Sequence, residues 1–347
     1  MRNEARPMFD ASIAPERLDD CLAVITTGLD VELKDVFRID PQDGGLFNYL
    51  LRIETRQGSY FFKQYLDDVP NPTYDPPAIP AARRCELACE VQRLAVQAMR
   101  GTNWPVVPEI MYVDRQRSAF VMTEAAGDEP LNDYFSRGER PESFLKKLPR
   151  VLAELHRSTF GRFEPGSLFG NTLFRDFKLG LQYDDIAVRL NSVEADRVLA
   201  CRAAYQDRTD CVTHGDINSR NIIAADAALG VIDFEQSHLG TPAYDLSYIL
   251  CELLISMETF GAGSEVAPIF GVFLDHYFEH FDAASRESVE TEMSQHLAIQ
   301  TLYRFWGPSR AAWTFYVDDP TAHRVIDSAR TLLMRDGPVT ALLGQLR

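Results

Sequence analysis

A chain of 347 residues, 46% of them hydrophobic and 25% charged, has enough apolar material for two domains or one bilobal unit. Its net charge of −16 excludes a nucleic-acid partner, because binding to a phosphate backbone requires a basic surplus. The same acidity favours a cationic small molecule or serves solubility alone, and both alternatives stay open. The N-terminus lacks the apolar stretch of a secretory signal, and the longest apolar runs are too short to span a bilayer. We therefore expect a cytoplasmic protein, monomeric or homodimeric, with no membrane partner.

The first predicted elements are strands. Residues 35–65 contain aromatic and β-branched runs separated by the turn signals DGG and RQGS, a pattern typical of a meander. The proline-rich residues 69–80 favour an extended loop, to which we assign no role. A helix is predicted over 81–99 from its apolar spacing, followed by two strands over 106–114 and 118–124.

After Gly127 the apolar positions recur at helical spacing. Long helices are expected over residues 141–160, 243–260, 265–281, 284–305 and 320–345. The predicted fold class is therefore α+β, with a small β-rich N-terminal lobe (1–125) and a larger, mostly helical C-terminal lobe (126–347).

Two groups of residues were considered as metal sites and are not favoured. Cys85 and Cys89 are four apart on the predicted helix, but no second Cys or His pair supports them, so helix packing is the preferred interpretation. His276 and His280 do not form the HExxH zinc signature, which favours a solvated helix face. We expect all six cysteines to be reduced, because nothing in the sequence indicates export.

The stretch THGDINSRNII, residues 213–223, places a polar run directly before an apolar strand. The strands NIIAA and LGVID, separated by a short turn, predict a hairpin that brings Asn221 beside Asp233. An amide oxygen and a carboxylate together suit Mg²⁺ with phosphate oxygens completing its shell. Asp216 precedes Asn221 by five residues, so we expect its carboxylate to accept a proton from an attacking hydroxyl.

At these residues the chain resembles the aminoglycoside phosphotransferase and choline kinase family, which has the bilobal protein-kinase-like fold. HGDINSRN is similar to the family's HGDxxxxN catalytic loop, and IDFEQSHLGTPAYDLS is similar to its IDxE segment followed by a YDL helix start. The resemblance implies an ATP-dependent phosphotransferase that uses Mg²⁺. Its acceptor would be a hydroxyl of a small molecule such as an aminoglycoside, an amino alcohol or a sugar. The resemblance does not decide between ATP and GTP.

The resemblance extends to a glycine-rich hairpin over the nucleotide phosphates. GGLFNYLLRI is similar to the family's GG-x-[ST]-N pattern, which implies that Gly44, Gly45 and Asn48 contact the cofactor. Phe47 stands where the family has Ser or Thr, so a side-chain hydroxyl contact to phosphate is missing at this position.

The resemblance also implies a lysine and a carboxylate at the nucleotide. Lys63 matches the lysine that reaches the α- and β-phosphates, held by a carboxylate of the following helix. We favour Glu90 as that carboxylate, with Glu86 as the alternative. FVMTEAAGDEPL resembles the strand and hinge between the lobes, where Met122 lines the base pocket or packs in the core, and backbone groups from Glu124 to Ala126 bind adenine.

Four further residues are expected to support the site structurally. His156 resembles the family histidine at a helix end, and His214 and Asp245 are expected to hold the catalytic loop through hydrogen bonds. Glu235 of the IDxE segment is assigned the same kind of supporting role.

The acceptor site is expected between the catalytic loop and the C-terminal helices, where Asn218 and residues 302–319 lie. Aromatic side chains with carboxylates there would hold a cationic amine, whereas the arginines would suit an acidic or phosphorylated acceptor. The residues concerned are Trp306, Trp313, Tyr316, Asp318 and Asp319 on one side and Arg304 and Arg310 on the other. The sequence leaves both alternatives open.

Two other functions were weighed. A protein kinase needs a long activation segment, but only 245 − 233 = 12 positions separate the two aspartates here and no APE element follows. A catalytically inactive binding module would lack one of Lys63, Asp216, Asn221 and Asp233, and all four are present. The sequence therefore favours a small-molecule kinase.

Overall fold

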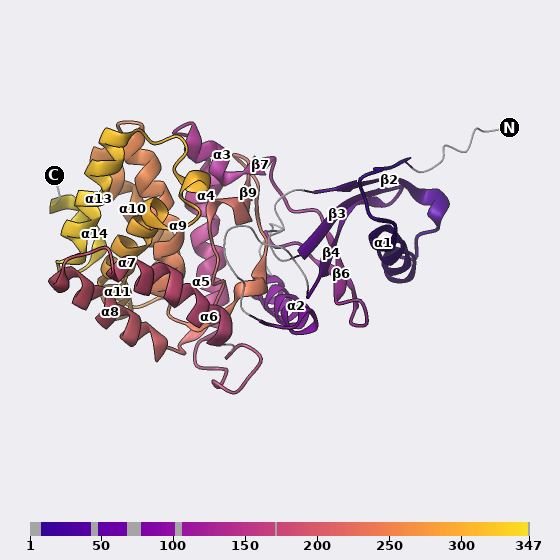
Figure 1. Cartoon of the computed structure of the whole chain (residues 1–347), viewed down its shortest axis with the longest axis horizontal. Helices are drawn as coiled ribbons and strands as arrows, with labels where there is room; N and C mark the ends of the chain where they lie inside the picture. Colours follow the sequence, from indigo (N-terminus) through magenta and orange to yellow (C-terminus); the bar gives the residue numbers. More distant parts are fainter. Residues whose placement is uncertain (1–7, 43–47, 68–77, 101–105, 171, 346–347) are drawn as a thin grey trace.

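The computed structural model describes residues 8–42, 48–67, 78–100, 106–170 and 172–345. Its N-terminal part is a sheet with the strand order β1-β2-β3-β4-β6-β5, antiparallel except for the β1-β2 pair (Figure 1). The strands are β1 (Met8–Phe9), β2 (Val36–Pro41), β3 (Asn48–Thr55), β4 (Gly58–Tyr65), β5 (Ile110–Asp114) and β6 (Ala119–Thr123).

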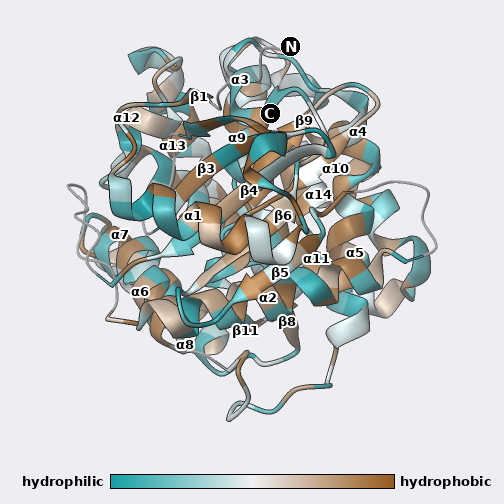
Figure 2. Cartoon of the chain, turned by 90° about the vertical axis from the view of Figure 1, so that its right-hand side faces the viewer, coloured by the Kyte–Doolittle hydropathy of each residue, from teal (hydrophilic) through white to brown (hydrophobic). Residues whose placement is uncertain are grey.

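One helix covers each face of this sheet. α1 (Pro15–Gly28) packs Cys21, Val24 and Ile25 against apolar residues of β2, β3 and β6. α2 (Ala81–Ala98) packs on the opposite face, where Tyr65 and Met122 lie. Because side chains alternate along a strand, Lys63 shares the α2 face with Tyr65. Figure 2 shows hydrophobic and hydrophilic residues alternating along α1, as burial of one helix face requires.

The C-terminal part is mostly helical (Figure 1). Its centre is α9 (Pro242–Thr259), buried on all sides from Pro242 to Met257 and packed against α11 (Ala283–Trp306). The other helices are α3 (Leu131–Ser136), α4 (Glu142–Lys146), α5 (Leu148–Thr159), α6 (Thr172–Leu179), α7 (Asp185–Ala187), α8 (Ser192–Gln206), α10 (Val266–Tyr277), α12 (Arg310–Trp313), α13 (Asp319–Leu333) and α14 (Val339–Gln345).

Short strands surround the loop of residues 213–221 within this helical part. β9 (Ile222–Ala224) lies between β10 (Leu229–Val231) and β7 (Glu129–Pro130), and β8 (Cys211–Thr213) pairs with β11 (His238–Gly240). Ile222 is opposite Val231 in the register, so the predicted hairpin of residues 221–233 is confirmed.

Most expected elements are present, and the α+β division into a β-rich and a helical part is confirmed. The sequence analysis missed α1 and the segment from α6 to α8, and residues 320–345 form two helices because Pro338 interrupts them. The predicted lobe boundary at 125/126 falls between β6 and β7 and stays a prediction. Gly44, Gly45 and Phe47, with most of the proline-rich loop, lie outside the described residues. No helix in the described ranges has the length and apolarity needed to cross a membrane.

The chain passes between the two parts at Gly127, whose φ of +117° suits glycine alone among the common residues. A Cβ atom at this position would lie 2.6 Å from the carbonyl oxygen of Ile223 in β9. The hinge therefore lies directly against the strand that follows the loop of residues 213–221.

A neutral histidine lies behind that loop. His238 is fully buried; its Nδ1 donates to the Gln236 carbonyl over 2.9 Å, and its Nε2 accepts from the Tyr205 hydroxyl over 2.7 Å. Burial is the main cause that lowers the pKa of His238 to about 4, and the charges of Arg175 and Lys178 act in the same direction. Asp245 opposes the shift without cancelling it.

Gly127→Ala should lower the free energy of unfolding by about 2 kcal/mol, because the new methyl group meets the β9 backbone at a strained φ. Urea denaturation measures this change. Gly271→Ala in α10 is the matched control, since open space surrounds that position and alanine favours a helix. A Gly127→Ala protein as stable as wild type would show that the hinge moves freely away from β9.

Stability should fall as the pH decreases from about 6.5 to 4, partly because of His238. The unfolded chain takes up a proton near the ordinary histidine pKa, whereas folded His238 takes it up only near pH 4, so acid favours the unfolded state. Complete protonation of His238 should lower the free energy of unfolding by about 3 kcal/mol. Melting temperatures measured against pH should have a shallower acid slope in His238→Gln. The exposed His323→Gln variant should keep the wild-type slope, and an unchanged slope in His238→Gln would contradict the prediction.

Candidate active site

The buried carboxylate of Asp245 organises the loop of residues 213–221, here called the catalytic loop. Its oxygens accept from the backbone N–H of His214 at 2.7 Å and of Gly215 at 3.1 Å. His156 donates to the same carboxylate at 3.0 Å and accepts from the Tyr277 hydroxyl at 2.9 Å. Burial alone would raise the pKa of Asp245, but the hydrogen bonds that it accepts from His156 and from the His214 backbone oppose this effect, and the pKa is lowered.

His214 links the loop to the hairpin. Its Nε2 donates to the Ile232 carbonyl at 3.0 Å, and burial is the main cause that lowers the pKa of its imidazole. Ser237 donates to the His214 carbonyl at 3.1 Å. Gly215 has a φ of +78°, and a Cβ atom there would lie 2.2 Å from the Gln236 carbonyl oxygen. The structure thus places His156, His214 and Asp245 where the supporting roles require.

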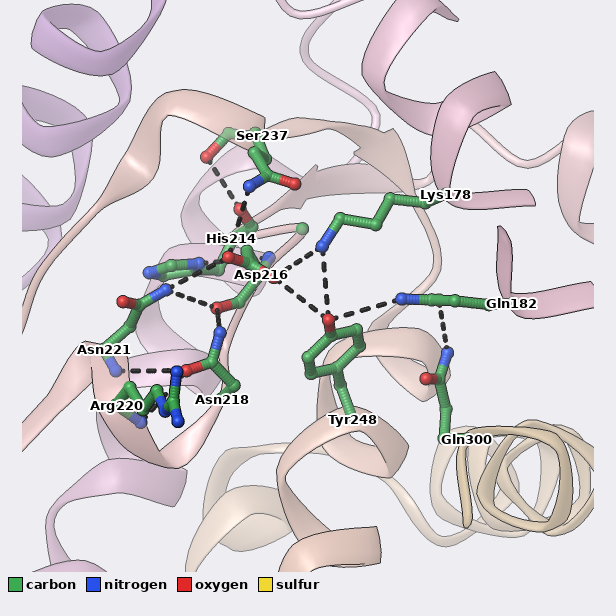
Figure 3. Close-up of polar contacts among 12 residues, drawn as sticks. Lys178, Gln182, His214, Asp216, Asn218, Arg220, Asn221, Ser237, Tyr248 and Gln300 are labelled. Carbon is green, nitrogen blue, oxygen red and sulfur yellow. Dashed lines mark hydrogen bonds and ion pairs between the residues drawn. The ribbon is translucent and has the colours of Figure 1, made fainter. Parts of the chain in front are cut away.

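Asp216 projects from the catalytic loop into a cluster of polar side chains (Figure 3). Lys178 of α6 donates to Asp216 Oδ1 at 2.5 Å, and the Tyr248 hydroxyl of α9 donates to the same oxygen at 3.0 Å. Asn221 and Gln236 donate to Oδ2 at 3.2 and 3.3 Å. Both oxygens are therefore oriented by fixed donors.

Behind this cluster, Tyr248 is itself held. Its hydroxyl accepts from Lys178 at 3.2 Å and from the Gln182 amide at 3.3 Å. Gln182 in turn accepts from Gln300 at 2.8 Å (Figure 3) and from the Tyr244 hydroxyl, also at 2.8 Å. This network is fully buried, so it fixes Tyr248 and, through it, the carboxylate of Asp216.

Asn218 and Asn221 shape the end of the loop. Asn218 Oδ1 accepts from the backbone N–H of Arg220 and of Asn221, and its amide donates to the Asp216 carbonyl. Asn218 was predicted to contact the acceptor. In the structure its side chain instead forms hydrogen bonds within the catalytic loop. Asn221 donates to Asp216 through Nδ2, and this orientation leaves Oδ1 for another partner.

Asp233 follows the hairpin in a left-handed conformation with φ of 70°. The backbone N–H of Ile232 donates to the Asn221 carbonyl at 3.0 Å, which places the two predicted metal ligands on adjacent strand ends. Asp233 Oδ1 lies 2.7 Å from Lys63 Nζ in β4. Burial alone would lower the pKa of Lys63, but the charges of Asp233 and Glu235 outweigh it and raise the pKa.

The prediction that Glu90, or alternatively Glu86, pairs with Lys63 is wrong. Glu90 pairs with Arg93 at 2.7 Å and Glu86 with Arg83 at 2.9 Å, both on the outward face of α2. The two glutamates are four residues apart and share that face, because positions i and i+4 lie together on a helix. Lys63 pairs with Asp233 instead.

The inward face of α2 carries an arginine. Arg84, only 6% exposed, lies 3.9 Å from Glu235 Oε2, and the Asn48 amide lies 3.5 Å from both oxygens of Glu235. Burial and, secondly, the charge of Asp233 raise the pKa of Glu235 to about 7. Glu235 thus joins the two parts of the chain, as a supporting residue should.

The expected adenine region lies at the edge of β6. Met122 packs with Tyr65 and Cys85 in the core beneath α2, and the Gln92 amide lies 3.6 Å from its sulfur. The Glu124 side chain points to Arg52 at 2.9 Å. The backbone of Ala126 lies so close to β10 that a Cβ atom on Gly230 would be 2.7 Å from the Ala126 oxygen.

The tryptophans proposed for the acceptor occupy different environments. Trp306 packs between α11 and α13 beside Phe305 and Ile326. Trp313 lies against two guanidinium groups, with Arg220 at 4.7 Å and Arg304 at 4.6 Å from its ring centroid. The structure brings Trp313, but not Trp306, into contact with the catalytic loop.

Arg304 is anchored by a residue that the sequence analysis did not assign. It donates to Glu252 Oε1 through Nε at 3.1 Å and Nη2 at 2.7 Å. Glu252 also accepts from the backbone N–H of Ser219 in the catalytic loop at 3.1 Å. This carboxylate therefore ties α11 to the loop.

A metal site must be judged from these donors. Among the described residues, no group of three or more His, Cys, Asp or Glu side chains is arranged around one point as a metal cage. Mg²⁺ with a nucleotide needs only one or two protein oxygens besides water and phosphate. Asp233 and the free Oδ1 of Asn221 meet this requirement, so the residues fit the ion.

Sequence reasoning missed Lys178, Tyr248 and Glu252. Tyr248 and Glu252 follow Asp245 by three and seven residues, so the three polar groups share one face of an otherwise apolar helix, a signal that was available. No comparable pattern marks Lys178, because it depends on how α6 packs.

Comparisons with known proteins agree with this geometry. A model of the phosphotransferase enzyme family matches residues 37–283 of the chain. No curated protein matches the sequence.

Solved structures share the fold at low identity. A choline/ethanolamine kinase family protein from Mesorhizobium loti is 19% identical, with 94% of this chain and 99% of that one covered and a TM-score of 0.51. An ethanolamine kinase from Plasmodium vivax is 16% identical, covering 92% and 88%, with a TM-score of 0.53. A gentamicin complex of APH(2")-IIa is 15% identical, covering 95% and 99%, with a TM-score of 0.51.

These similarities confirm the bilobal kinase-like fold expected from the sequence. The family match spans most of the sheet, from β2 to β6, together with the hinge, the catalytic loop and the hairpin with Asp233. The chain belongs to the phosphotransferase enzyme family.

Proposed function

We propose that this protein transfers the γ-phosphoryl group of ATP to a hydroxyl group of a small molecule, with Mg²⁺ as cofactor. The observation that carries the proposal is the meeting of Lys63 and Asp233 across the two lobes, next to a loop that fixes Asp216 and Asn221. Family membership and the fold support it.

In the proposed reaction the acceptor oxygen attacks the γ-phosphorus, and the bond from that phosphorus to the bridging oxygen breaks. ADP leaves with the electron pair of the broken bond, and the hydroxyl proton passes to Asp216. Asn221 and Asp233 would hold Mg²⁺, which neutralises charge on the phosphate oxygens. Lys63 supplies a second, buried positive charge for the nucleotide.

Each lobe has its own task in this proposal. Residues 1–125 bind the nucleotide, with Asn48, Lys63 and the backbone from Glu124 to Ala126 as contacts. Residues 126–347 provide the base and bind the acceptor. The hydrogen bonds to both oxygens of Asp216 hold its carboxylate ready without a conformational search, which is how a fixed loop accelerates the transfer.

Loss of the nucleotide site should be measurable without an acceptor. Calorimetry with ATP and Mg²⁺ should show binding that weakens by about 10-fold or more in Lys63→Ala and Asp233→Ala, because each change removes a charged contact. The exposed Lys34→Ala variant is the control and should bind as wild type does. Equal affinity in all four proteins would remove the roles assigned to Lys63 and Asp233.

Asp216→Asn should separate binding from chemistry. The amide has nearly the same shape but cannot take the proton, so ATP affinity should persist while turnover falls by about 10² or more. ADP release with any accepted hydroxyl compound measures turnover, and the melting temperature checks folding. Turnover within a few-fold of wild type would exclude Asp216 as the base. A joint loss of ATP affinity would place Asp216 in the metal site.

A further inference from the structure

Cationic side chains line one side of the candidate base. Lys178, Arg220 and Arg304, with the rings of Tyr248 and Trp313 between them, are here called the cationic wall. Lys178 is 7% exposed, and its ammonium contacts the same oxygen of Asp216 that the Tyr248 hydroxyl contacts (Figure 3). An acceptor hydroxyl that reaches this oxygen of Asp216 therefore meets the ammonium group.

The aromatic rings of the wall connect its cations. The Tyr248 ring has Lys178 Nζ at 5.2 Å and the Arg304 guanidinium at 4.6 Å from its centroid. The Trp313 ring has the guanidinium groups of Arg304 and Arg220 at 4.6 and 4.7 Å. The wall therefore extends without a break from Asp216 to Arg220 in the catalytic loop.

Positive charge exceeds negative charge along the wall. Lys178 pairs with Asp216 and Arg304 pairs with Glu252, whereas Arg220, within the part of the chain that the structure describes, contacts the Ala312 carbonyl and the Trp313 ring. Three cations thus face two carboxylates, in a protein whose net charge is −16.

Arg304 also has an unused donor. It is fully buried, and its Nη1 has no hydrogen-bond partner among the described residues. A buried charged donor without an acceptor is unfavourable, so the charge of Arg304 is only partly compensated by Glu252.

The same geometry opposes a cationic acceptor. The rings that would bind an ammonium group already hold the protein's own cations. Asp318 was one of the carboxylates predicted to bind a cationic acceptor. In the structure it caps α13 by accepting from the Thr321 N–H at 2.8 Å. A positive charge on the acceptor would add to three cations that two carboxylates offset, so it would weaken binding.

We propose that the acceptor carries a carboxylate or a phosphate close to the hydroxyl that is phosphorylated, and that the positive charge of the cationic wall, with Lys178 beside Asp216 and Arg220 in the catalytic loop, favours this anion. Arg304 adds charge from behind Tyr248. This inference rests on the proposed phosphotransferase function and names the acceptor class of that same site.

The test uses acceptors that differ only in charge. Glycerate, glycerol 3-phosphate, glycerol and 3-amino-1,2-propanediol share two neighbouring hydroxyl groups and carry a carboxylate, a phosphate, no charge and an ammonium group. ADP release by the full chain with ATP and Mg²⁺ gives kcat/KM for each. We expect at least one anion to exceed glycerol by about 10-fold or more and the amine to rank last. The two anions separate carboxylate from phosphate recognition.

Variants then assign the preference to the wall. Arg220→Gln should lower kcat/KM for the favoured anion through KM, by about 10-fold more than it lowers kcat/KM for glycerol. Lys178→Met should lower turnover of every acceptor, because Lys178 also holds Asp216. It should in addition remove the preference for the anion, so that kcat/KM for the anion no longer exceeds kcat/KM for glycerol. Lys178→Arg keeps the positive charge and should retain part of the preference for the anion over glycerol. The matched control is Arg197→Gln on α8, which removes an exposed ion pair with Asp336.

Binding separates this inference from the proposed function. Calorimetry with glycerol 3-phosphate and with glycerate reads the anion site without turnover, and the affinity should fall about 10-fold in Arg220→Gln. Anion binding without ADP release would contradict the phosphotransferase function but support the site. ADP release with glycerol or the amine ahead of both anions, or anion affinity equal in wild type and Arg220→Gln, would overturn the inference.

Discussion

The catalytic loop depends on one buried negative charge, that of Asp245. It stays ionised in the core because two backbone N–H groups and His156 surround it, and their hydrogen bonds oppose the effect of burial on its pKa. Removing a partner would leave a buried charge uncompensated, which is far more costly than losing an exposed ion pair. Because Asp245 lies in the first turn of the buried helix α9, the loop takes its position from the centre of the helical lobe.

The two ion pairs described between the lobes have the same orientation of charge. Lys63 and Arg84 supply the cations from the N-terminal lobe, and Asp233 and Glu235 supply the carboxylates from the segment after the hairpin. The family pattern led us to expect a glutamate on α2, but this helix turns Glu90 outward. The position of α2 is consequently tied to the same short segment that carries the proposed metal ligand.

The sequence was informative where a function depends on spacing along the chain. Asp216, Asn221 and the hairpin are local, so their arrangement followed from residue order and strand pattern. The partner of Lys63 was wrong because helix phase decides which side chains of α2 face inward, and the motif alone did not give that phase. Lys178 was missed because its contact with Asp216 spans 38 positions and depends on how α6 packs. The helix α1 was missed because the N-terminal segment was assessed only for a signal sequence.

Most of the wall lies outside the catalytic loop, although Arg220 belongs to both. Lys178, Arg304 and Trp313 lie on three helices that take no part in the hydrogen bonds around Asp245, but Lys178 and Tyr248 contact Asp216 directly. Mutations at Trp313 can therefore change which molecule is recognised with less effect on the base than mutations at Lys178. Such a division lets descendants of one ancestral gene acquire new substrates by a few exchanges in the wall. Tyr248 and the carboxylate of Asp216 would be the positions where selection tolerates least variation.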